Sequence, residues 1–364
     1  MIYVDASRIS NTPFRTGVEA YSFHLINALA KLVPRDITLV SPRKIPLDVP
    51  QLIIPFPRLW TQVRLSWEVW KNKNIQTLFI PSHLMPIVHP KNLGPSSASG
   101  TIITIHDVAF KRFPECYSLP SRLYLDWGTR FAVKHAKTII VPSQVTKDDL
   151  IEFYKADPQK TVVIPHGYTS LSRSERSEEP PHHLRSQRYF LFIGRIERKK
   201  NLLTLIHAFE LFSKTHPDFK LVLAGKPGVG SDEIIRAAKS NTNIVLPGYV
   251  DEPTKIALLK NAFAFVLPSL YEGFGFPILE AMEFKLPLIC SDIPASREVA
   301  GDAALYFKPD DAEGLVDTMK KLIETPETVK SLIAKYPAIL AHHSWERCAK
   351  ATLETLINKR PMSF

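Results

Sequence analysis

Short apolar runs alternate with amphipathic segments in the first half of the chain. The runs, rich in Val and Ile, are MIYVDAS, ITLV, LFIPS, TIITIH, TIIVPS and TVVIP. Residues 17–32 place Leu25, Ala28, Leu29 and Leu32 at helical spacing. Strands of this composition separated by helices are typical of a parallel sheet covered on both faces. The first half is therefore predicted to be an α/β domain.

A polar stretch interrupts this alternation at SLSRSERSEEPPHHLRSQ, residues 170–187, and is typical of a linker, which we place at 171–187. The pattern then resumes with YFLFIGR, FKLVLAG, NIVLPG, AFVLPS, LPLICSD and AALYF, and helices are predicted at 201–214, 232–240, 252–261 and 277–285. Two α/β domains are expected, with ligands at the carboxyl ends of their strands and a cleft between them. The tail SWERCAKATLETLINKR is helical, but its periodicity does not assign it to either domain.

Composition agrees with two globular domains in 364 residues, with 45% hydrophobic and 23% charged side chains. The three cysteines, Cys116, Cys290 and Cys348, lie singly and favour neither a disulfide framework nor a zinc site. No apolar run approaches the roughly 20 residues that cross a bilayer, and MIYVDAS lacks the regions of a signal peptide. A cytoplasmic location is therefore expected.

The net charge of +10 suggests an anionic partner. Phosphorylated ligands, an anionic membrane surface and nucleic acid would each fit, and an inert basic surface stays open. Nothing resembles a zinc finger or an aromatic RNA-binding signature, so no nucleic-acid partner is expected. There is neither a GxGxxG after a strand nor a GxxxxGK[ST], so a nicotinamide or P-loop site is disfavoured.

The stretch FIGRIERKKN concentrates cations at a strand-to-helix turn. Gly194 ends the strand, Arg195 follows, and Lys199 and Lys200 precede a helix expected to begin at about Asn201. Free helix N–H groups and cations together form an anion site. Lysines at a helix start oppose the dipole, so either an anionic ligand compensates or the turn is simply solvated.

The stretch YEGFGFPILEAM, residues 271–282, combines a glycine-rich corner with two carboxylates. Gly273 and Gly275 allow close approach of the backbone to a ligand, and Pro277 suits a first helical turn. Glu280 is expected in that turn, where an acid complements the dipole. For Glu272, no such structural reason explains a carboxylate placed beside an expected anion site. Neutral hydroxyl donors, such as those of a sugar, would satisfy it.

In the first half, TIITIHD places His106 and Asp107 at the carboxyl end of a strand, and Gly17 begins a helix after RISNTPFRT. A lone histidine is usually structural or solvated. At a strand end facing the expected cleft, His106 is nevertheless a functional candidate. No Asp-x-Asp pair occurs in the chain, so a departing diphosphate would be stabilised by Arg195 and Lys200 in place of a metal.

These stretches together resemble the retaining GT-B-fold glycosyltransferases of family four, and within them bacterial mannosyltransferase-like members that build surface polysaccharide. EGFGFPILEAM followed by LPLICSDIPASREVAGDAALYFKPDD carries the resemblance, with FIGRIERKKN, GYV, RTGVEAYSFHLINAL, TIHDVAFKRFPECY and IIVPSQVTKDDL. It covers nearly the whole chain. It implies two Rossmann-like domains facing each other across a donor/acceptor cleft. The amino domain would comprise 1–170 and a returning helix, 346–364, and the carboxyl domain 188–345.

The resemblance also implies residue roles. Arg195 and Lys200 would hold and stabilise the donor diphosphate, Glu280 the ribose and Glu272 the transferred sugar, with His106 near the reaction centre. The remaining implied donor contacts are Gly17, Gly194, Tyr249, Val250, Gly275, Phe276, Pro277 and Ile278. The family often has two adjacent glycines at the first loop, whereas Thr16 precedes Gly17 here.

The implied reaction moves a sugar from a nucleotide-sugar donor, with GDP-mannose as the expected one, to a glycan or lipid-linked glycan. It retains the anomeric configuration and uses no metal or cofactor. A non-catalytic nucleotide-sugar-binding protein and a sugar-nucleotide epimerase of the same fold remain alternatives.

A further segment, residues 55–73, combines aromatic and basic residues. Phe56, Trp60, Val63, Trp67 and Trp70 would share one helical face, with Arg58, Arg64, Lys71 and Lys73 around it. Such a face suits a membrane interface, although Leu65 and Val69 favour core packing. Peripheral association with the inner face of the cytoplasmic membrane, driven by the overall basic charge, is the other expectation.

Overall fold

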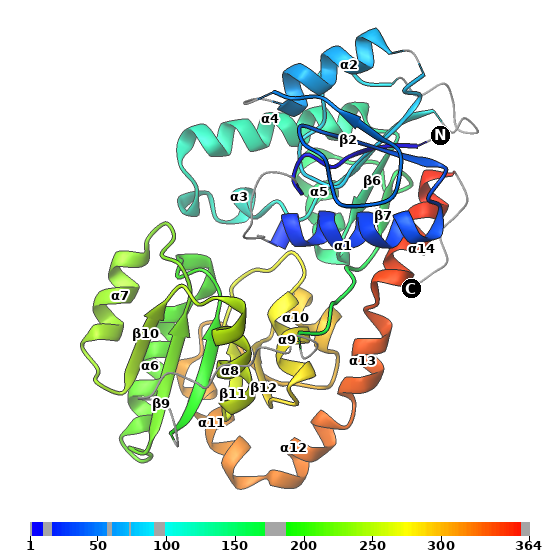
Figure 1. Ribbon diagram of the computed structural model, residues 1–364. Coiled ribbons are helices and arrows are strands. Elements are labelled where there is room, and N and C mark those ends of the chain that lie inside the picture. Colours follow the sequence, from blue (N-terminus) through cyan, green and yellow to red (C-terminus); the bar gives the residue numbers. More distant parts are fainter. Residues whose placement is uncertain are drawn as a thin grey trace. The chain divides into compact units, whose positions relative to one another are not determined.

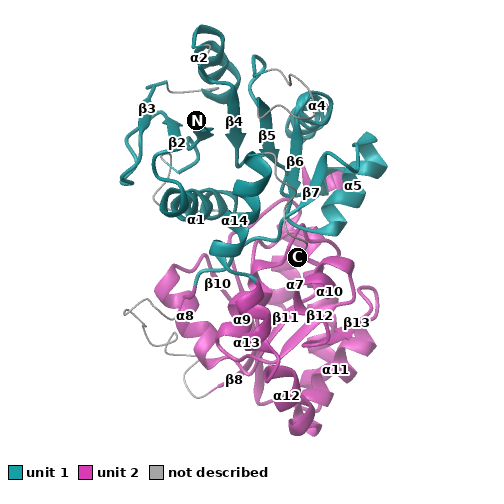
Figure 2. Ribbon diagram, turned by 90° about the vertical axis from the view of Figure 1, so that its right-hand side faces the viewer, with its two compact units in different colours: residues 1–112, 118–169, 343–364 teal, residues 113–117, 170–342 magenta. Residues whose placement is uncertain are grey.

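The computed structural model describes residues 2–9, 17–56, 60–72, 74–90, 99–171 and 187–357. The chain forms two compact units, residues 1–112, 118–169 and 343–364 in the first and residues 113–117 and 170–342 in the second (Figure 2). Most of the predicted linker lies outside the described residues. Residues 113–117, residue 170 and residues 343–345 belong to the units opposite to those predicted. For residues 343–345, the cause is pairing of the Tyr168 N–H with the His343 carbonyl, 2.7 Å apart.

Unit 1 contains a seven-stranded sheet whose strands pair in parallel in the order β3-β2-β1-β4-β5-β6-β7. Its strands are β1 Ile2–Asp5, β2 Ile37–Ser41, β3 Gln51–Ile53, β4 Thr77–Ile80, β5 Gly100–Thr104, β6 Thr138–Val141 and β7 Thr161–Val163. Every residue of β1, β2, β4 and β5 is buried, which is why their sequences are continuous apolar runs. The predicted parallel sheet is confirmed, and only β3 lacked a signal.

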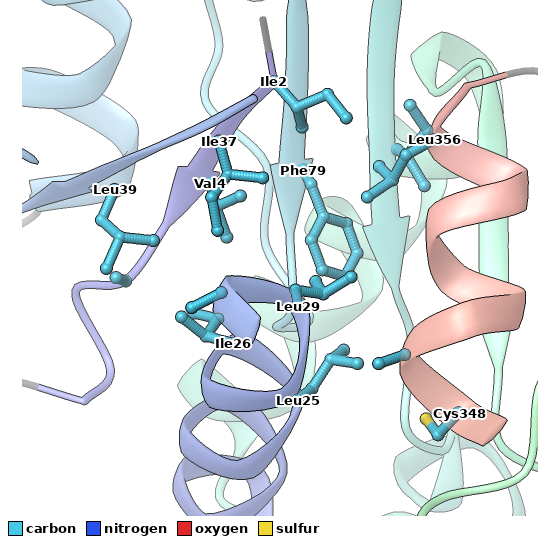
Figure 3. Packing of buried hydrophobic residues seen from close by; sticks show 14 of the residues in the cluster. Ile2, Val4, Leu25, Ile26, Leu29, Ile37, Leu39, Phe79, Cys348 and Leu356 are labelled. Carbon is cyan, nitrogen blue, oxygen red and sulfur yellow. The ribbon is translucent and has the colours of Figure 1, made fainter. Parts of the chain in front are cut away.

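The helices of unit 1 come from both ends of the chain (Figure 1). They are α1 Gly17–Leu32, α2 Ser66–Lys71, α3 Ala109–Arg112, α4 Leu119–His135, α5 Gln144–Tyr154 and α14 Trp345–Leu356, and a π-helical turn, Trp60–Leu65, precedes α2. Leu25 and Leu29 of α1 share one buried cluster with Phe79 of β4 and with Cys348 and Leu356 of α14 (Figure 3). The last helix therefore completes the core of the amino-terminal sheet.

Unit 2 repeats the architecture with six parallel strands in the order β10-β9-β8-β11-β12-β13. The strands are β8 Arg188–Ile193, β9 Phe219–Ala224, β10 Ile244–Gly248, β11 Ala264–Leu267, β12 Leu288–Ser291 and β13 Leu305–Phe307. The helices are α6 Leu202–Ser213, α7 Ser231–Lys239, α8 Glu252–Asn261, α9 Phe276–Glu283, α10 Pro294–Ala300, α11 Ala312–Glu324, α12 Pro326–Ile333 and α13 Tyr336–His342. The four helices predicted here correspond to α6–α9.

Both sheets have the strand order of a Rossmann fold. The order reverses between β1 and β4 in unit 1 and between β8 and β11 in unit 2. Ligands of such sheets bind at the carboxyl ends of the strands beside this reversal. In unit 2 these ends lead into Arg195 and Glu272, and in unit 1 the end of β4 leads into Pro81, beside the β5 end that leads to His106.

Candidate active site

The turn after β8 presents exposed arginines and a buried carboxylate. The Arg195 side chain is 66% exposed, and its Nε lies 3.6 Å from Oε2 of Glu197. Lys199 Nζ lies 3.5 Å from the other oxygen of Glu197, a residue that is only 7% exposed. Glu197 therefore holds the turn that presents Arg195. Its role was not predictable from the sequence, because an acid among four cations gives no signal of burial.

A glycine in the next loop allows this turn to form. Gly194 donates its N–H to the carbonyl of Ala224 at 3.0 Å. A Cβ on the following Gly225, whose φ is +156°, would lie 1.7 Å from the Gly194 carbonyl oxygen. The ends of β8 and β9 can approach this closely only because position 225 lacks a side chain.

Lys200 and Glu272, predicted from two separate loops, meet in the structure. Lys200 Nζ lies 2.6 Å from Oε1 of Glu272, and their side chains are 14% and 12% exposed. Ser269 donates its hydroxyl to the same oxygen at 2.6 Å. Ser291 in turn donates to the carbonyl of Ser269 at 2.5 Å. The carboxylate that local sequence left unexplained thus has a cation partner and a hydroxyl that fixes its direction.

The start of α9 differs from the prediction in the position of Glu280 and in the hydrogen bonding of the Ile278 N–H. Gly275 precedes the helix with φ +122°, and Pro277 occupies its first turn as expected. The helix already begins at Phe276, so Glu280 is its fifth residue and there is no acid in the first turn. The N–H of Ile278 donates to the Gly275 carbonyl at 3.0 Å, so this amide already has a partner inside the turn.

Glu280 instead pairs with a residue of α8. Lys255 Nζ lies 2.8 Å from Oε1 of Glu280, with both side chains about one-fifth exposed. Tyr249 and Val250 lie between β10 and α8, and the Tyr249 ring is 51% exposed with Lys226 Nζ 4.3 Å from its centroid. Lys255 therefore connects α8 to the predicted ribose-binding residue of α9, and no local pattern in its own helix indicates this pairing.

In unit 1, His106 is surrounded by polar and aromatic groups. Its Nδ1 lies 3.2 Å from Nε2 of His166 and its Nε2 lies 3.3 Å from the Pro81 carbonyl oxygen. The Tyr21 ring stands edge-on at 4.8 Å. Burial lowers the pKa of His106 to about 4. Asp107 accepts the N–H of Ala109 at 3.1 Å, which fits a structural role at the start of α3.

Gly17 is the exposed first residue of α1, and a Cβ there would have no atom within 4 Å. Packing among the described residues does not require glycine at this position. Thr16 and the rest of 10–16 lie outside the described residues. A contact of this loop with the donor stays a prediction.

The aromatic segment 55–73 is divided between core and surface. Trp60 is 8% exposed and donates its ring N–H to the Ile54 carbonyl at 3.0 Å, and Leu65 and Val69 are also buried. Trp67 and Trp70 are each 58% exposed, with ring centroids 5.6 Å apart. The predicted single aromatic face is therefore wrong, because Trp60 packs inward. Arg58 and Lys73 lie outside the described residues.

Within the part of the chain that the structure describes, no helix combines the length and apolar character needed to span a bilayer. Nor do the described His, Cys, Asp and Glu side chains form a group of three or more that could hold a metal ion. The charged groups of unit 2 offer cations for phosphate oxygens and carboxylates for sugar hydroxyls. Unit 1 offers a neutral imidazole.

Two family models match the chain in succession. The model described as Glycosyltransferase Family 4 matches residues 15–169, and the model described as Glycosyl transferases group 1 matches residues 174–337. An O-antigen chain mannosyltransferase B of Escherichia coli is 29% identical over 268 residues, which cover 71% of this chain and 70% of that protein. The O-antigen chain mannosyltransferase RfbU of Salmonella typhimurium is 24% identical, covering 92% and 95%.

Solved structures show the same fold at lower identity. The Anabaena protein HepE, crystallised with UDP and glucose, has a TM-score of 0.69 at 16% identity, with 98% of both chains covered. A sucrose-phosphate synthase from Thermosynechococcus elongatus has a TM-score of 0.70 at 17% identity, with 97% of both chains covered. At this level of identity the likeness shows the fold, which is the GT-B type with two parallel-sheet α/β domains.

Proposed function

Since this chain belongs to the glycosyltransferases of family 4, we propose that it transfers a sugar from a nucleotide-sugar donor to a glycan or lipid-linked glycan acceptor. The observation that carries the proposal is the largely buried pair of Lys200 and Glu272 at the carboxyl edge of the unit 2 sheet. A cation and a carboxylate in contact can bind different parts of one nucleotide sugar, the cation a phosphate oxygen and the carboxylate the sugar hydroxyls.

The diphosphate is the ligand for the cations. Arg195 is exposed and directed by Glu197, and Lys200 can exchange the Glu272 oxygen for a phosphate oxygen. Each charge-assisted hydrogen bond gained there contributes about 1.5–3 kcal/mol. The exchange releases Glu272, still held by Ser269, to accept hydrogen bonds from hydroxyls of the sugar. Ground-state pairing thus keeps both groups oriented before the donor arrives.

The nucleoside is assigned to the edge formed by α8 and α9. Glu280 would accept from the ribose hydroxyls, and Lys255 already holds its carboxylate in place. Backbone groups at Tyr249 and Val250 would meet the base. The backbone would approach the donor closely at Gly194, Gly275, Phe276 and Pro277, and at Gly17 of unit 1.

We further propose that the reaction retains the anomeric configuration and needs no metal. The bond from the anomeric carbon to the diphosphate oxygen breaks while a bond from that carbon to the acceptor oxygen forms on the same face. The acceptor proton passes to the departing phosphate oxygen. Arg195 and Lys200 stabilise the charge that develops on that diphosphate. The proposed role of His106 is to act near the sugar as a neutral ring, since burial lowers its pKa to about 4.

Mannose is the proposed sugar, with GDP-mannose as donor, because two relatives carry mannosyltransferase names and both act, by those names, on O-antigen chains. The acceptor is accordingly a surface polysaccharide or its lipid-linked precursor.

A panel of nucleotide sugars tests the proposal. We expect one of them to raise the melting temperature and to be slowly hydrolysed without acceptor. Lys200→Ala and Glu272→Gln should each lower transfer at least 100-fold, a loss of about 2.7 kcal/mol in transition-state stabilisation. Lys330→Ala and Glu327→Gln are matched controls, since that ion pair in unit 2 is 72% and 86% exposed.

The alternatives predict different outcomes from the same panel. A non-catalytic binding protein would be stabilised by a nucleotide sugar without any turnover. An epimerase would convert the donor with no acceptor present. Full transfer by Lys200→Ala and Glu272→Gln would refute the site assignment.

We also propose a cytoplasmic enzyme that contacts the anionic inner face of the cytoplasmic membrane peripherally. Trp67 and Trp70 project from α2, and Lys71 lies at its carboxyl end. Helix α4 adds Leu119, Leu123 and Trp127, which are 58%, 59% and 43% exposed at a spacing of four residues. Exposed apolar stripes with cations nearby suit an anionic bilayer surface.

Vesicle sedimentation tests this contact. Binding should be stronger to vesicles containing anionic phosphatidylglycerol than to neutral phosphatidylcholine, and should fall several-fold in Trp67→Ala/Trp70→Ala and in Leu123→Ser/Trp127→Ser. Val229→Ser, an exposed apolar residue of unit 2, is the control. Equal binding by all of these variants would exclude the two helices as the contact.

A further inference from the structure

Two histidines at strand ends of unit 1 form a pair that the proposed chemistry only half uses. His106 follows β5 and His166 follows β7. Nδ1 of His106 lies 3.2 Å from Nε2 of His166, which is 2% exposed. The Tyr21 ring packs against both, with centroids 4.8 Å from His106 and 4.3 Å from His166. The proposed reaction gives His106 a role and leaves His166 without one.

The surroundings of His106 determine which ring nitrogen carries the hydrogen. The Pro81 carbonyl oxygen lies 3.3 Å from Nε2 and can only accept a hydrogen bond. Nε2 must therefore carry the hydrogen, and Nδ1 of a neutral ring is then an acceptor. Nε2 of His166 must in turn carry a hydrogen to donate to Nδ1. The two bonds specify one tautomer for each ring.

Both rings also stay neutral. Burial lowers the pKa of His106 to about 4 and that of His166 well below its usual value. The charged and titratable neighbours of the pair include Tyr21, His83, Asp107, Arg8 and His343, and of these Asp107 alone favours a protonated ring. A proton placed on Nδ1 of His106 would face the N–H of His166, which adds a direct steric and electrostatic penalty.

We propose that His166 is a positioning residue for sugar transfer, which donates to Nδ1 of His106 and holds that ring as a single tautomer in one orientation. The proposal rests on the proposed place of His106 beside the donor sugar. A ring whose N–H is directed at the Pro81 carbonyl presents a fixed, uncharged surface to the sugar. It also does not compete with the departing phosphate oxygen for the acceptor proton.

Two substitutions at 166 separate hydrogen bonding from packing. His166→Phe keeps an aromatic ring against Tyr21 but removes the donor, whereas His166→Gln places an amide N–H at a length close to that of Nε2. Tyr21→Phe is the matched control, because it keeps the ring contacts with both histidines and removes only the hydroxyl that contacts Thr104.

The direct readout is the tautomer of His106, followed by long-range proton–nitrogen correlation spectra of protein with ¹⁵N-labelled histidine. Wild type, Tyr21→Phe and His166→Gln should show a protonated Nε2 and a bare Nδ1. His166→Phe should show a mixture of tautomers and a raised pKa of His106. An unchanged His106 signal in His166→Phe would overturn the proposal.

Kinetics supply the second readout. In His166→Phe, kcat should fall about tenfold while KM for the donor changes less than about twofold, and His166→Gln should recover to within about threefold of wild type. Equal losses in the Phe and Gln variants would show a purely structural residue. If wild type consumes no nucleotide sugar, the proposed function fails, while the spectra still decide whether His166 sets the tautomer.

Discussion

At the scale of single residues, pairs of groups from separate segments of unit 2 define the candidate site. Lys200 pairs with Glu272 of the loop after β11 at 2.6 Å, and Lys255 of α8 pairs with Glu280 of α9 at 2.8 Å. The sequence identified three of these four residues, because strand ends and a glycine-rich helix start have local signals. Lys255 had none, since nothing in its own helix shows that α9 packs beside it. Ser269 was hidden for the same reason.

Gly225 gives a prediction at this scale. With φ +156° and the Gly194 carbonyl oxygen 1.7 Å from a Cβ, Gly225→Ala forces β8 and β9 apart and should lower the free energy of unfolding by roughly 2–4 kcal/mol. Thermal and denaturant unfolding measure the loss. Gly17→Ala is the stability control, because its Cβ would meet nothing within 4 Å. Equal stability of the two variants would show that the loop moves aside freely.

At the scale of elements, strands were more predictable than helices. Strands such as β1, β2, β4 and β5 are buried along their whole length, so a run of apolar residues suffices to identify them. Helix α1 was also predicted to its bounds, from its apolar spacing. Helix α4 was not predicted. Its exposed face carries apolar side chains at Leu119, Leu123 and Trp127, so the sequence lacks the alternation of apolar and polar faces that indicates an amphipathic helix. Periodicity likewise left open where α14 packs.

The start of α14 gives the prediction for an element. The Ser344 hydroxyl oxygen accepts the N–H of Arg347 at 3.2 Å, which satisfies one of the free amides of the first turn. Ser344→Ala should therefore destabilise the protein by about 1 kcal/mol, and Ser344→Asp, which keeps an acceptor, should restore stability. Denaturant unfolding measures both. If Ser344→Asp destabilised the protein as much as Ser344→Ala, the Ser344 hydroxyl would stabilise it through a contact other than the Arg347 N–H.

At the scale of the whole molecule, the chain returns to the unit in which it began. Leu356 of α14 is 1% exposed and belongs to the same cluster as Ile2 of β1 and Leu29 of α1 (Figure 3). Unit 1 therefore needs residues from both ends of the chain for one core. The sequence could not show this by pattern alone, because a buried leucine on a helix does not identify the sheet that covers it.

This arrangement predicts that a change near the carboxyl terminus destabilises the amino-terminal sheet selectively. Leu356→Ala should leave a cavity that costs about 2–4 kcal/mol. Hydrogen exchange should then show lost protection in β1, β2 and α1, with β8 to β13 unchanged. Ile357→Ala, at a neighbouring residue that is 44% exposed, should change neither. Loss of protection in unit 2, or in both units equally, would contradict a core that α14 shares with the other elements of unit 1.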